Sequence, residues 1–309
     1  MQNENPTDKK KQRLLLRFRF GLRTLFILVT ILTLVGGFYL ASIRKQKEAV
    51  KILQSHGGSV GYDFHFRAGY SDRHALSTVP LWLLDLFGVD AFHQVVEVNM
   101  NFRIEDNAVK LNTKHVAESW LALPQLPHIR HLNMDYGNCT EDSFSNIRYL
   151  KELESIQISD VHLGDAAIKH LENLTSLQTV VIRNAGLTDE SLKILAKLPK
   201  LQKLAVDGNA FTNDGLAEIA NSRSLTELFI GGKQCTINDD GIPLLAKLKR
   251  LKEIELRHTQ ISNTGLQHFD AMKSVKILRV GNTNVTWKGA DQFKKTKRPD
   301  VVFQGGGLR

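Results

Sequence analysis

Apolar positions recur through the second two-thirds of the chain with a period close to 24 residues. Each unit opens with an L-x-x-L-x-L frame, and successive frames begin 24, 24, 24, 24, 26 and 24 residues apart. The frames begin at Ile129, Leu153, Leu177, Leu201, Leu225, Leu251 and Val275. A looser unit begins at Val95 and is followed by extra residues around 101–113. Self-similarity at this period predicts a solenoid of stacked supersecondary units.

Two shorter periodicities inside each unit predict a strand followed by a helix. Val180 and Ile182 are two residues apart, so they would share one face of a strand. Leu192 and Leu195 are three residues apart, the spacing of one helix face. Because a single unit cannot bury its apolar face alone, the pattern predicts parallel strands stacked into one sheet, with helices along its outer side.

A column of residues suited to capping precedes the predicted helices. The column consists of Thr140, Gly164, Thr188, Thr212, Asn238, Ser262 and Thr286. A serine or threonine oxygen there can accept an N–H of the first helical turn. Acidic residues such as Asp165, Asp189, Asp214 and Asp239 follow. Negative charge at these positions favours the positive end of a helix dipole.

An uncharged apolar segment occupies residues 24–43. As a helix it would be about 30 Å long, the thickness of a bilayer's hydrocarbon core. Of the formal charge of +9, residues 1–43 carry +5, because seven basic residues oppose Glu4 and Asp8. The positive-inside rule then places the N-terminus in the cytoplasm and the following chain outside.

Two other interpretations of this segment are weaker. A cleaved signal peptide has a shorter apolar core and a small-x-small cleavage site, which Tyr39 interrupts. A helix of a protein core would show a polar face, and this segment has only threonine and serine. We therefore predict a cytoplasmic tail at 1–23 and an uncleaved transmembrane signal anchor at 24–43.

Residues 44–92 predict a small α/β capping segment before the repeats, which occupy 93–309. An amphipathic stretch at 45–53 favours a helix, and SVGYDFHF alternates as a strand does. PLWLLDLFG follows, with a proline suited to a first helical turn. Because the first repeat of a solenoid has an open apolar end, we expect this helix to cover it. The expected contacts are Trp82, Leu83, Leu86 and Phe87.

These motifs resemble the leucine-rich repeat of the 24-residue L-x-x-L-x-L…T-D-x-G-L-x-x-L type. The order of anchor, KEAVKILQSHGGSVGYDF and PLWLLDLFG is also similar to the N-terminal arrangement of membrane-anchored leucine-rich repeat proteins of planctomycete bacteria. The resemblance implies an α/β solenoid with parallel strands on the concave face and helices on the convex face. It implies a single-pass protein of the cell membrane with periplasmic repeats, and no particular ligand.

The scattered cysteines and histidines predict no metal site and no cofactor. Cys139 falls in an apolar column and Cys235 lies in the two-residue insertion, four repeats later. At about 4.8 Å per strand they are about 20 Å apart, too far for a disulfide. His128 and His131 would face opposite sides of a strand, and no tetrahedral ligand set accompanies them.

Glu253 and Glu255 form the most enzyme-like pair, beside Glu227 on the preceding strand. Two carboxylates could flank a glycosidic bond in a secreted, cleaved envelope enzyme. Stacking in register favours cross-strand ion pairs instead. The expected pairs are Arg279 with Glu255, Lys203 with Glu227, and Arg183 with Asp207. Because no phosphate loop or nucleophile elbow occurs, we expect no catalytic site.

A basic cluster near the C-terminus contains Lys294, Lys295, Lys297 and Arg298. It lacks interleaved aromatic residues, and the predicted topology places it outside the cytoplasm. We therefore expect a solvated last helix and no nucleic-acid partner.

Binding to a protein or cell-envelope partner is the function that an extended repeat face favours, with a regulatory or adaptor role as an alternative. Alternation exposes a central row, namely Asn99, Asn133, Gln157, Val181, Ala205, Phe229, Glu255 and Arg279. Phe229 is either an anchor for a partner or an isolated surface aromatic. The candidate partner-binding residues are Val181, Arg183, Lys203, Ala205, Asp207, Glu227, Phe229 and Glu255.

Overall fold

The computed structural model describes residues 21–67, 70–71, 75–101, 113–135 and 139–305. It divides the chain into two compact units, Met1–Arg44 and Lys45–Arg309. Most of the basic tail predicted at 1–23 and most of the extra residues predicted around 101–113 lie outside the described residues.

One continuous helix, α1 (Leu22–Ser55), begins in the first unit and ends in the second. The sequence predicted two helices here, at 24–43 and 45–53. The apolar side chains between Leu22 and Leu40 are largely exposed, whereas a core helix would bury them. Among the described helices, α1 alone is long and apolar enough, by length and composition, to cross a bilayer.

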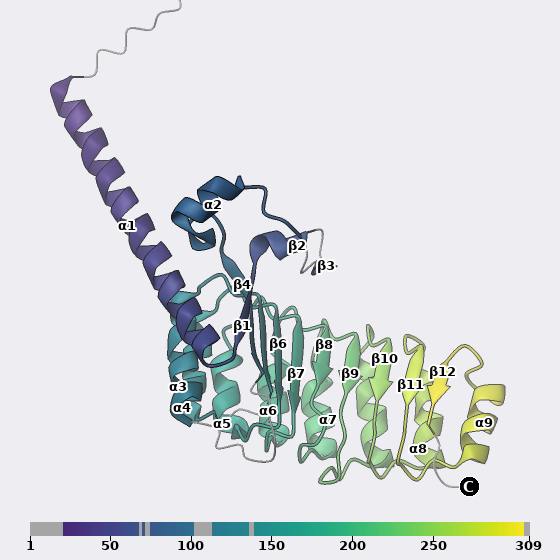
Figure 1. The fold of residues 1–309 in the computed structure, drawn as a ribbon. Coiled ribbons are helices and arrows are strands. Elements are labelled where there is room, and N and C mark those ends of the chain that lie inside the picture. The colour runs from purple at the N-terminus through teal and green to yellow at the C-terminus, as the bar shows by residue number, and fades with distance from the viewer. Residues whose placement is uncertain (1–20, 68–69, 72–74, 102–112, 136–138, 306–309) are drawn as a thin grey trace, which may run out of the picture. The chain divides into compact units, whose positions relative to one another are not determined.

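The second unit is built on a ten-stranded sheet, shown in Figure 1. Its strands, in spatial order, are β1 (Ser59–Tyr62), β4 (Val95–Asn101), β5 (His131–Asp135), β6 (Ser155–Ser159), β7 (Thr179–Arg183), β8 (Lys203–Ala205), β9 (Glu227–Phe229), β10 (Glu253–Glu255), β11 (Ile277–Arg279) and β12 (Val302–Gln304). β1 is antiparallel to β4, and the other neighbours are parallel. A separate hairpin pairs β2 (Phe66–Arg67) with β3 (Tyr70–Ser71).

Short helices connect the parallel strands and lie along one side of the sheet (Figure 1). The α-helices are α3 (Thr113–Ala122), α4 (Glu141–Phe144), α5 (Gly164–Ile168), α6 (Asp189–Leu195), α7 (Asn213–Ile219), α8 (Asn263–His268) and α9 (Trp287–Thr296). The 3₁₀ segments among them are η4 (Leu123–Gln125), η5 (Ser145–Tyr149), η6 (Lys169–Leu171), η7 (Asp239–Lys247) and η8 (Phe269–Ala271). Before β4 stand η2 (Asp63–His65), α2 (Leu81–Phe87) and η3 (Val89–Ala91).

The core confirms the predicted α/β solenoid and its register. Leu204 of β8 pairs with Val180 on one side and Leu228 on the other, and all three are fully buried. The seven predicted frame starts, from Ile129 to Val275, are buried as well. Each repeat therefore contributes one layer to a continuous apolar core between sheet and helices.

Five of the seven predicted capping residues accept a first-turn N–H. These are Thr140, Thr212, Asn238, Ser262 and Thr286. Gly164 is instead the first residue of α5, so its capping position was predicted one residue late. Thr188 precedes α6 without a capping bond, and its hydroxyl donates to Asp165 Oδ2 at 2.6 Å.

The residue after each of the five capping positions from Gly164 to Ser262 links one repeat to the next. Asp189 accepts from both the backbone N–H of Thr212, at 3.0 Å, and its hydroxyl, at 2.6 Å. The other links join Asp165 to Thr188, Asn213 to Asn238, Asp239 to Ser262, and Asn263 to Thr286. We call this column the Asp/Asn ladder. The sequence had suggested only a helix-dipole role for the acidic residues.

The ladder explains the glycine of the T-D-x-G motif. A methyl group on Gly215 would overlap Asp189 Oδ1, and one on Gly241 would overlap Asn213 Oδ1. The same conflict arises between Gly265 and Asp239, and between Gly289 and Asn263. Glycine at this position therefore leaves room for the linking side chain of the preceding repeat.

The cover of the first repeat differs from the prediction. Trp82, Leu86 and Phe87 are 65%, 67% and 58% exposed, and Leu83 is only half-buried. The last turns of α1 contribute buried residues instead, including Ala49, Val50 and Leu53. β1 also pairs with the outer edge of β4. Residues 45–62 thus cover the end of the solenoid in place of α2.

The last helix also differs in part from the prediction. Lys294, Lys295 and Lys297 are exposed as expected, but Arg298 is 2% exposed. Its guanidinium donates to the carbonyls of Phe269 and Met272 at 3.0 Å, and to that of Val275 at 2.6 Å. Arg298 therefore supplies a charged donor to three carbonyl groups of the preceding repeat, of which those of Phe269 and Met272 also accept backbone N–H groups.

Candidate functional site

The central row on the face of the sheet opposite the helices has the predicted register. Asn99, Asn133, Gln157, Val181, Ala205, Phe229, Glu255 and Arg279 pair in that order. Two members are not exposed as predicted: Val181 is 6% exposed and Ala205 is 0% exposed. Ala205 is a short side chain between larger neighbours, and Lys203 Nζ lies over the ring of Phe229, 5.0 Å from its centroid. The expected apolar strip is therefore mostly covered.

The predicted ion pairs between strands are all present. Arg183 Nε lies 3.6 Å from Asp207 Oδ2, and Lys203 Nζ lies 2.9 Å from Glu227 Oε2. Arg279 Nη1 lies 3.8 Å from Glu255 Oε2 and also pairs with Glu253. Both carboxylates of the enzyme-like pair are thus held by a guanidinium. This arrangement is the predicted charge ladder on the sheet.

The chain leaves each repeat strand through a residue in the left-handed conformation. From β6 to β11 these residues are Asp160, Asn184, Gly208, Gly232, His258 and Asn282, with φ of 59°, 50°, 75°, 137°, 52° and 55°. Backbone bonds continue between repeats beyond the strands, as from Gly208 N to Gly231 O at 2.7 Å. The turns therefore stack in register and form an edge of the sheet where side chains of successive repeats lie side by side.

Glycines interrupt this edge and open a cavity of about 570 Å³. Gly208 and Gly232 have no side chain where the neighbouring repeats carry Asn184 and His258. A methyl group on Gly231 would overlap the carbonyl oxygen of Arg257, so the backbones approach closely there. We call this space the strand-end cavity; its lining is Arg183, Asn184, Asp207, Gly208, Gly231, Gly232, Lys233, Gln234, Glu255, Arg257 and His258.

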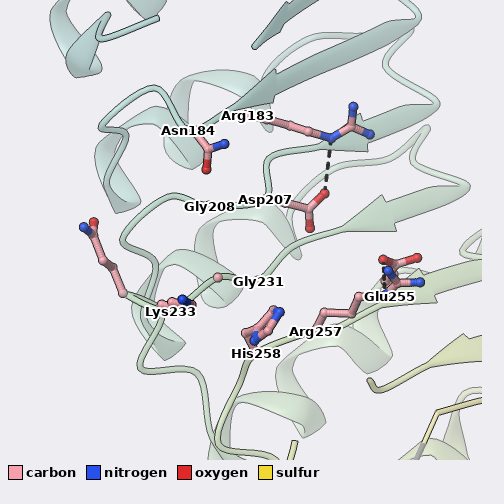
Figure 2. Close-up of a pocket in the computed structure, with 11 residues that line it drawn as sticks. Arg183, Asn184, Asp207, Gly208, Gly231, Lys233, Glu255, Arg257 and His258 are labelled. Carbon is pink, nitrogen blue, oxygen red and sulfur yellow. Dashed lines mark ion pairs between the residues drawn. The ribbon is translucent and has the colours of Figure 1, made fainter. Parts of the chain in front are cut away.

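Charged pairs form the walls of the strand-end cavity. Figure 2 shows Arg183 and Asp207 on one side of Gly231 and Arg257 and His258 on the other. Arg257 Nε lies 2.7 Å from Glu255 Oε1. Burial raises the pKa of Asp207 above its usual value although Arg183 opposes the shift. Burial likewise raises the pKa of Glu255 against the influence of Arg257.

The charge arrangement suits a ligand that carries polar groups of both signs. Each wall offers a guanidinium and a carboxylate, and partial burial strengthens hydrogen bonds from a ligand to these groups. Lys233 is exposed at the rim, and no ion pair of its ammonium occurs within the described residues. Packing therefore does not fix the Lys233 side chain, and a ligand can enter the cavity past it.

The predicted candidate residues separate into two groups. Arg183, Asp207 and Glu255 line the cavity. Lys203, Glu227 and Phe229 lie on the sheet surface and do not line the cavity. Val181 and Ala205 are buried and do not line it either. Sequence reasoning missed Arg257, His258 and Lys233. Arg257 occupies the same place in its repeat as Arg183 and Asp207, so alignment of the repeats could have identified it.

Burial of the two cysteines and side-chain contacts of His128 and His131 favour structural roles for these residues. Cys139 and Cys235 are free and buried, and burial raises the pKa of their thiols to about 12 and about 11. His128 Nδ1 lies 2.9 Å from Glu152 Oε1, while the His131 ring stacks on Phe66. Within the described residues, no group of three or more histidine, cysteine or acidic side chains is placed to hold a metal ion.

Comparison with known proteins supports the repeat interpretation locally. Residues 197–220 match the family model for the leucine-rich repeat, and this segment contains β8 and α7. No curated protein sequence matches the chain. Among solved structures, the chain is similar to an internalin C2 from Listeria monocytogenes str. 4b F2365. That match has 16% identity and a TM-score of 0.38, and covers 60% of this chain and 73% of the internalin chain.

Proposed function

We propose that this is a membrane-anchored leucine-rich repeat protein that binds a protein partner at the strand-end cavity. The observation that carries the proposal is the gap made by Gly208, Gly231 and Gly232 between turns that carry Arg183 and Asn184 on one side and Arg257 and His258 on the other. The absence of side chains at these positions leaves space for a ligand, and the flanking charges can orient it.

A polypeptide ligand matches the spacing of the cavity walls. Charged residues lie on the four consecutive repeats of β7 to β10, with Lys233 in that of β9, so an extended segment could meet opposite charges in succession. Phe229 adds a partly exposed ring on the neighbouring sheet surface. An apolar group beside a polar rim is the usual composition of a protein contact surface.

The anchor part of the proposal rests on residues 24–43 and on the charge asymmetry around them. Seven basic residues precede the apolar segment, which favours a cytoplasmic N-terminus and extracytoplasmic repeats. The exposed apolar side chains of α1 support a membrane anchor at this segment. A partner would then be a protein of the cell envelope.

Site-specific photo-cross-linking in intact membranes tests the position of the binding site. A photoreactive residue at position 233 places the reactive group at the cavity rim. The same residue at position 193, exposed on the helical side next to a second cavity of about 590 Å³, provides the comparison. We expect a discrete cross-linked protein from position 233. Cross-linking from position 193 alone would move the binding site to the helices.

A further inference from the structure

Helix α2 exposes a group of large apolar side chains that the solenoid does not use. Leu81, Trp82, Leu86 and Phe87 are 76%, 65%, 67% and 58% exposed, and we call these four residues the α2 patch. Leu76 and Phe92, on either side of the helix, are also exposed. Single exposed apolar side chains are ordinary, but four large ones on one seven-residue helix indicate a contact surface.

The segment after α2 is hydrogen-bonded to residues near the start of the second unit, Lys45–Arg309. Gln46 Nε2 donates to Asp90 Oδ1 at 3.0 Å and to the carbonyl oxygen of His93 at 2.8 Å. The hydroxyl of Tyr62 also donates to Asp90 Oδ1, at 3.0 Å. Only Gly88 and Val89 separate α2 from Asp90. The α2 patch is thus tied, through a few residues, to position 46.

Position 46 is close along the helix to the end of the apolar segment. Gln46 follows Ile43 by only three residues, so the length of the chain alone keeps their α-carbons within about 11 Å of each other. If residues 24–43 cross a bilayer, Gln46 must lie in or next to its interfacial layer, which is several ångströms thick. The bonds to Asp90 and His93 then keep α2 within reach of that layer.

We propose that the α2 patch inserts into the lipid interface beside the anchor. Tryptophan, phenylalanine and leucine are the residues that amphipathic helices insert at this depth. Arg44, Lys45, Lys47 and Lys51 lie next to the anchor and can meet anionic headgroups. This inference rests on the proposed membrane anchor. It gives the repeat unit a second contact with the membrane besides the transmembrane helix.

Tryptophan quenching by brominated lipid in vesicles tests the inference on the full chain. The vesicles contain phosphatidylcholine and phosphatidylglycerol, with bromine near the glycerol end of the acyl chains. Trp82 and Trp287 are matched, because both are 65% exposed, and Trp287 begins the last helix. Trp120 is fully buried and contributes a common background. We compare the wild type with Trp82→Phe and Trp287→Phe.

We expect Trp82→Phe to lose most of the quenching and Trp287→Phe to retain it. Equal quenching in the two variants, in protein that resists alkaline extraction, would overturn the α2 inference and leave the anchor intact. Release of the chain by alkaline extraction would overturn both proposals. Protection of Trp82 from aqueous acrylamide without lipid quenching would assign the patch to a protein contact and would also contradict the inference.

Discussion

Asn209 is a fully buried amide that joins the turns of two neighbouring repeats. Its Oδ1 accepts from the backbone N–H groups of Ala185, at 3.0 Å, and Leu187, at 3.1 Å. Its Nδ2 donates to carbonyl oxygens that include those of Ile182 and Val206. Thr259 and Thr283 occupy the same place in later repeats and bond only within their own turns.

Asn209→Ala should lower the free energy of unfolding by roughly 2–5 kcal/mol, because it leaves buried backbone groups of two repeats unpaired. Chemical denaturation measures the loss. Asn221→Ala, which removes an exposed amide, serves as the control and should change stability by less than about 0.5 kcal/mol. Similar losses in the two variants would show that the buried amide does not join the turns.

Asp165 makes the first link of the Asp/Asn ladder depend on pH. Although burial raises its pKa, hydrogen bonds from Ser191 and Thr188 outweigh burial and lower it below the usual value. A lowered folded-state pKa stabilises the fold above the unfolded value, near 3.9, and this contribution is lost as pH falls through the folded value.

Asp165→Asn should therefore be less stable than the wild type by about 1 kcal/mol at pH 7, because an amide forms weaker hydrogen bonds than a carboxylate. The difference should shrink as the pH falls below about 4. Denaturation of both proteins across this range measures it. Asn213 and Asn263 show that an amide can occupy the ladder position, so the variant should fold. A difference independent of pH would contradict the role given to the carboxylate.

At the scale of the element, the first turns of the helices show how one repeat limits which residues the next repeat can carry. Alanine usually replaces glycine inside a helix with a gain of about 0.5–1 kcal/mol. At Gly215 a methyl group would instead displace Asp189 Oδ1, and the Asp189 carboxylate is held in place by two hydrogen bonds that it accepts from Thr212, one on each oxygen. The interior of α7 therefore depends on a residue of the preceding repeat.

Gly215→Ala should destabilise the protein by about 1–3 kcal/mol, the usual cost of overpacking. In an Asp189→Ala background the displaced oxygen is absent, so the same substitution should cost less or stabilise. A double-mutant cycle from denaturation curves measures the coupling. Additive effects of the two substitutions would show that the ladder does not require this glycine.

The sequence predicted those strands and helices that a local, periodic pattern of apolar residues specifies. The frame from Leu177 to Ile182 determined both the strand and its register, because alternation and repeat length leave one way to stack. The position of α2 could not be predicted in this way. Trp82 and Phe87 showed that the helix is apolar but not which surface it contacts. The end of α1 covers the first repeat in place of α2.

The strand-end cavity was predicted only in part, for a related reason. Arg183, Asp207 and Glu255 were identified from charge pairing between strands. Gly208 and Gly232 form the cavity through their left-handed turns, and turn geometry is not visible in a pattern of polar and apolar positions. The cavity becomes evident when the turns of several repeats are placed in register.

At the scale of the whole molecule, the proposed topology places all the repeats on one side of a membrane. A reporter enzyme fused after Arg309, active only outside the cytoplasm, should be active in cells that express the full chain. The same fusion without residues 24–43 should be inactive, because nothing then directs export. Activity of a cytoplasmic reporter at the same position would show that the orientation is reversed.

Partner affinity is the most direct measure of the proposed binding function, once cross-linking has supplied the partner. Lys233→Glu reverses a charge at the rim of the strand-end cavity, and Lys193→Glu makes the same change on the exposed side of α6. Because both side chains are exposed, neither substitution should unfold the protein, which thermal melts can verify. Our account predicts that Lys233→Glu changes the dissociation constant at least tenfold, about 1.4 kcal/mol, while Lys193→Glu leaves it unchanged. Equal dissociation constants for wild type and Lys233→Glu, with a change in Lys193→Glu, would contradict binding at the cavity.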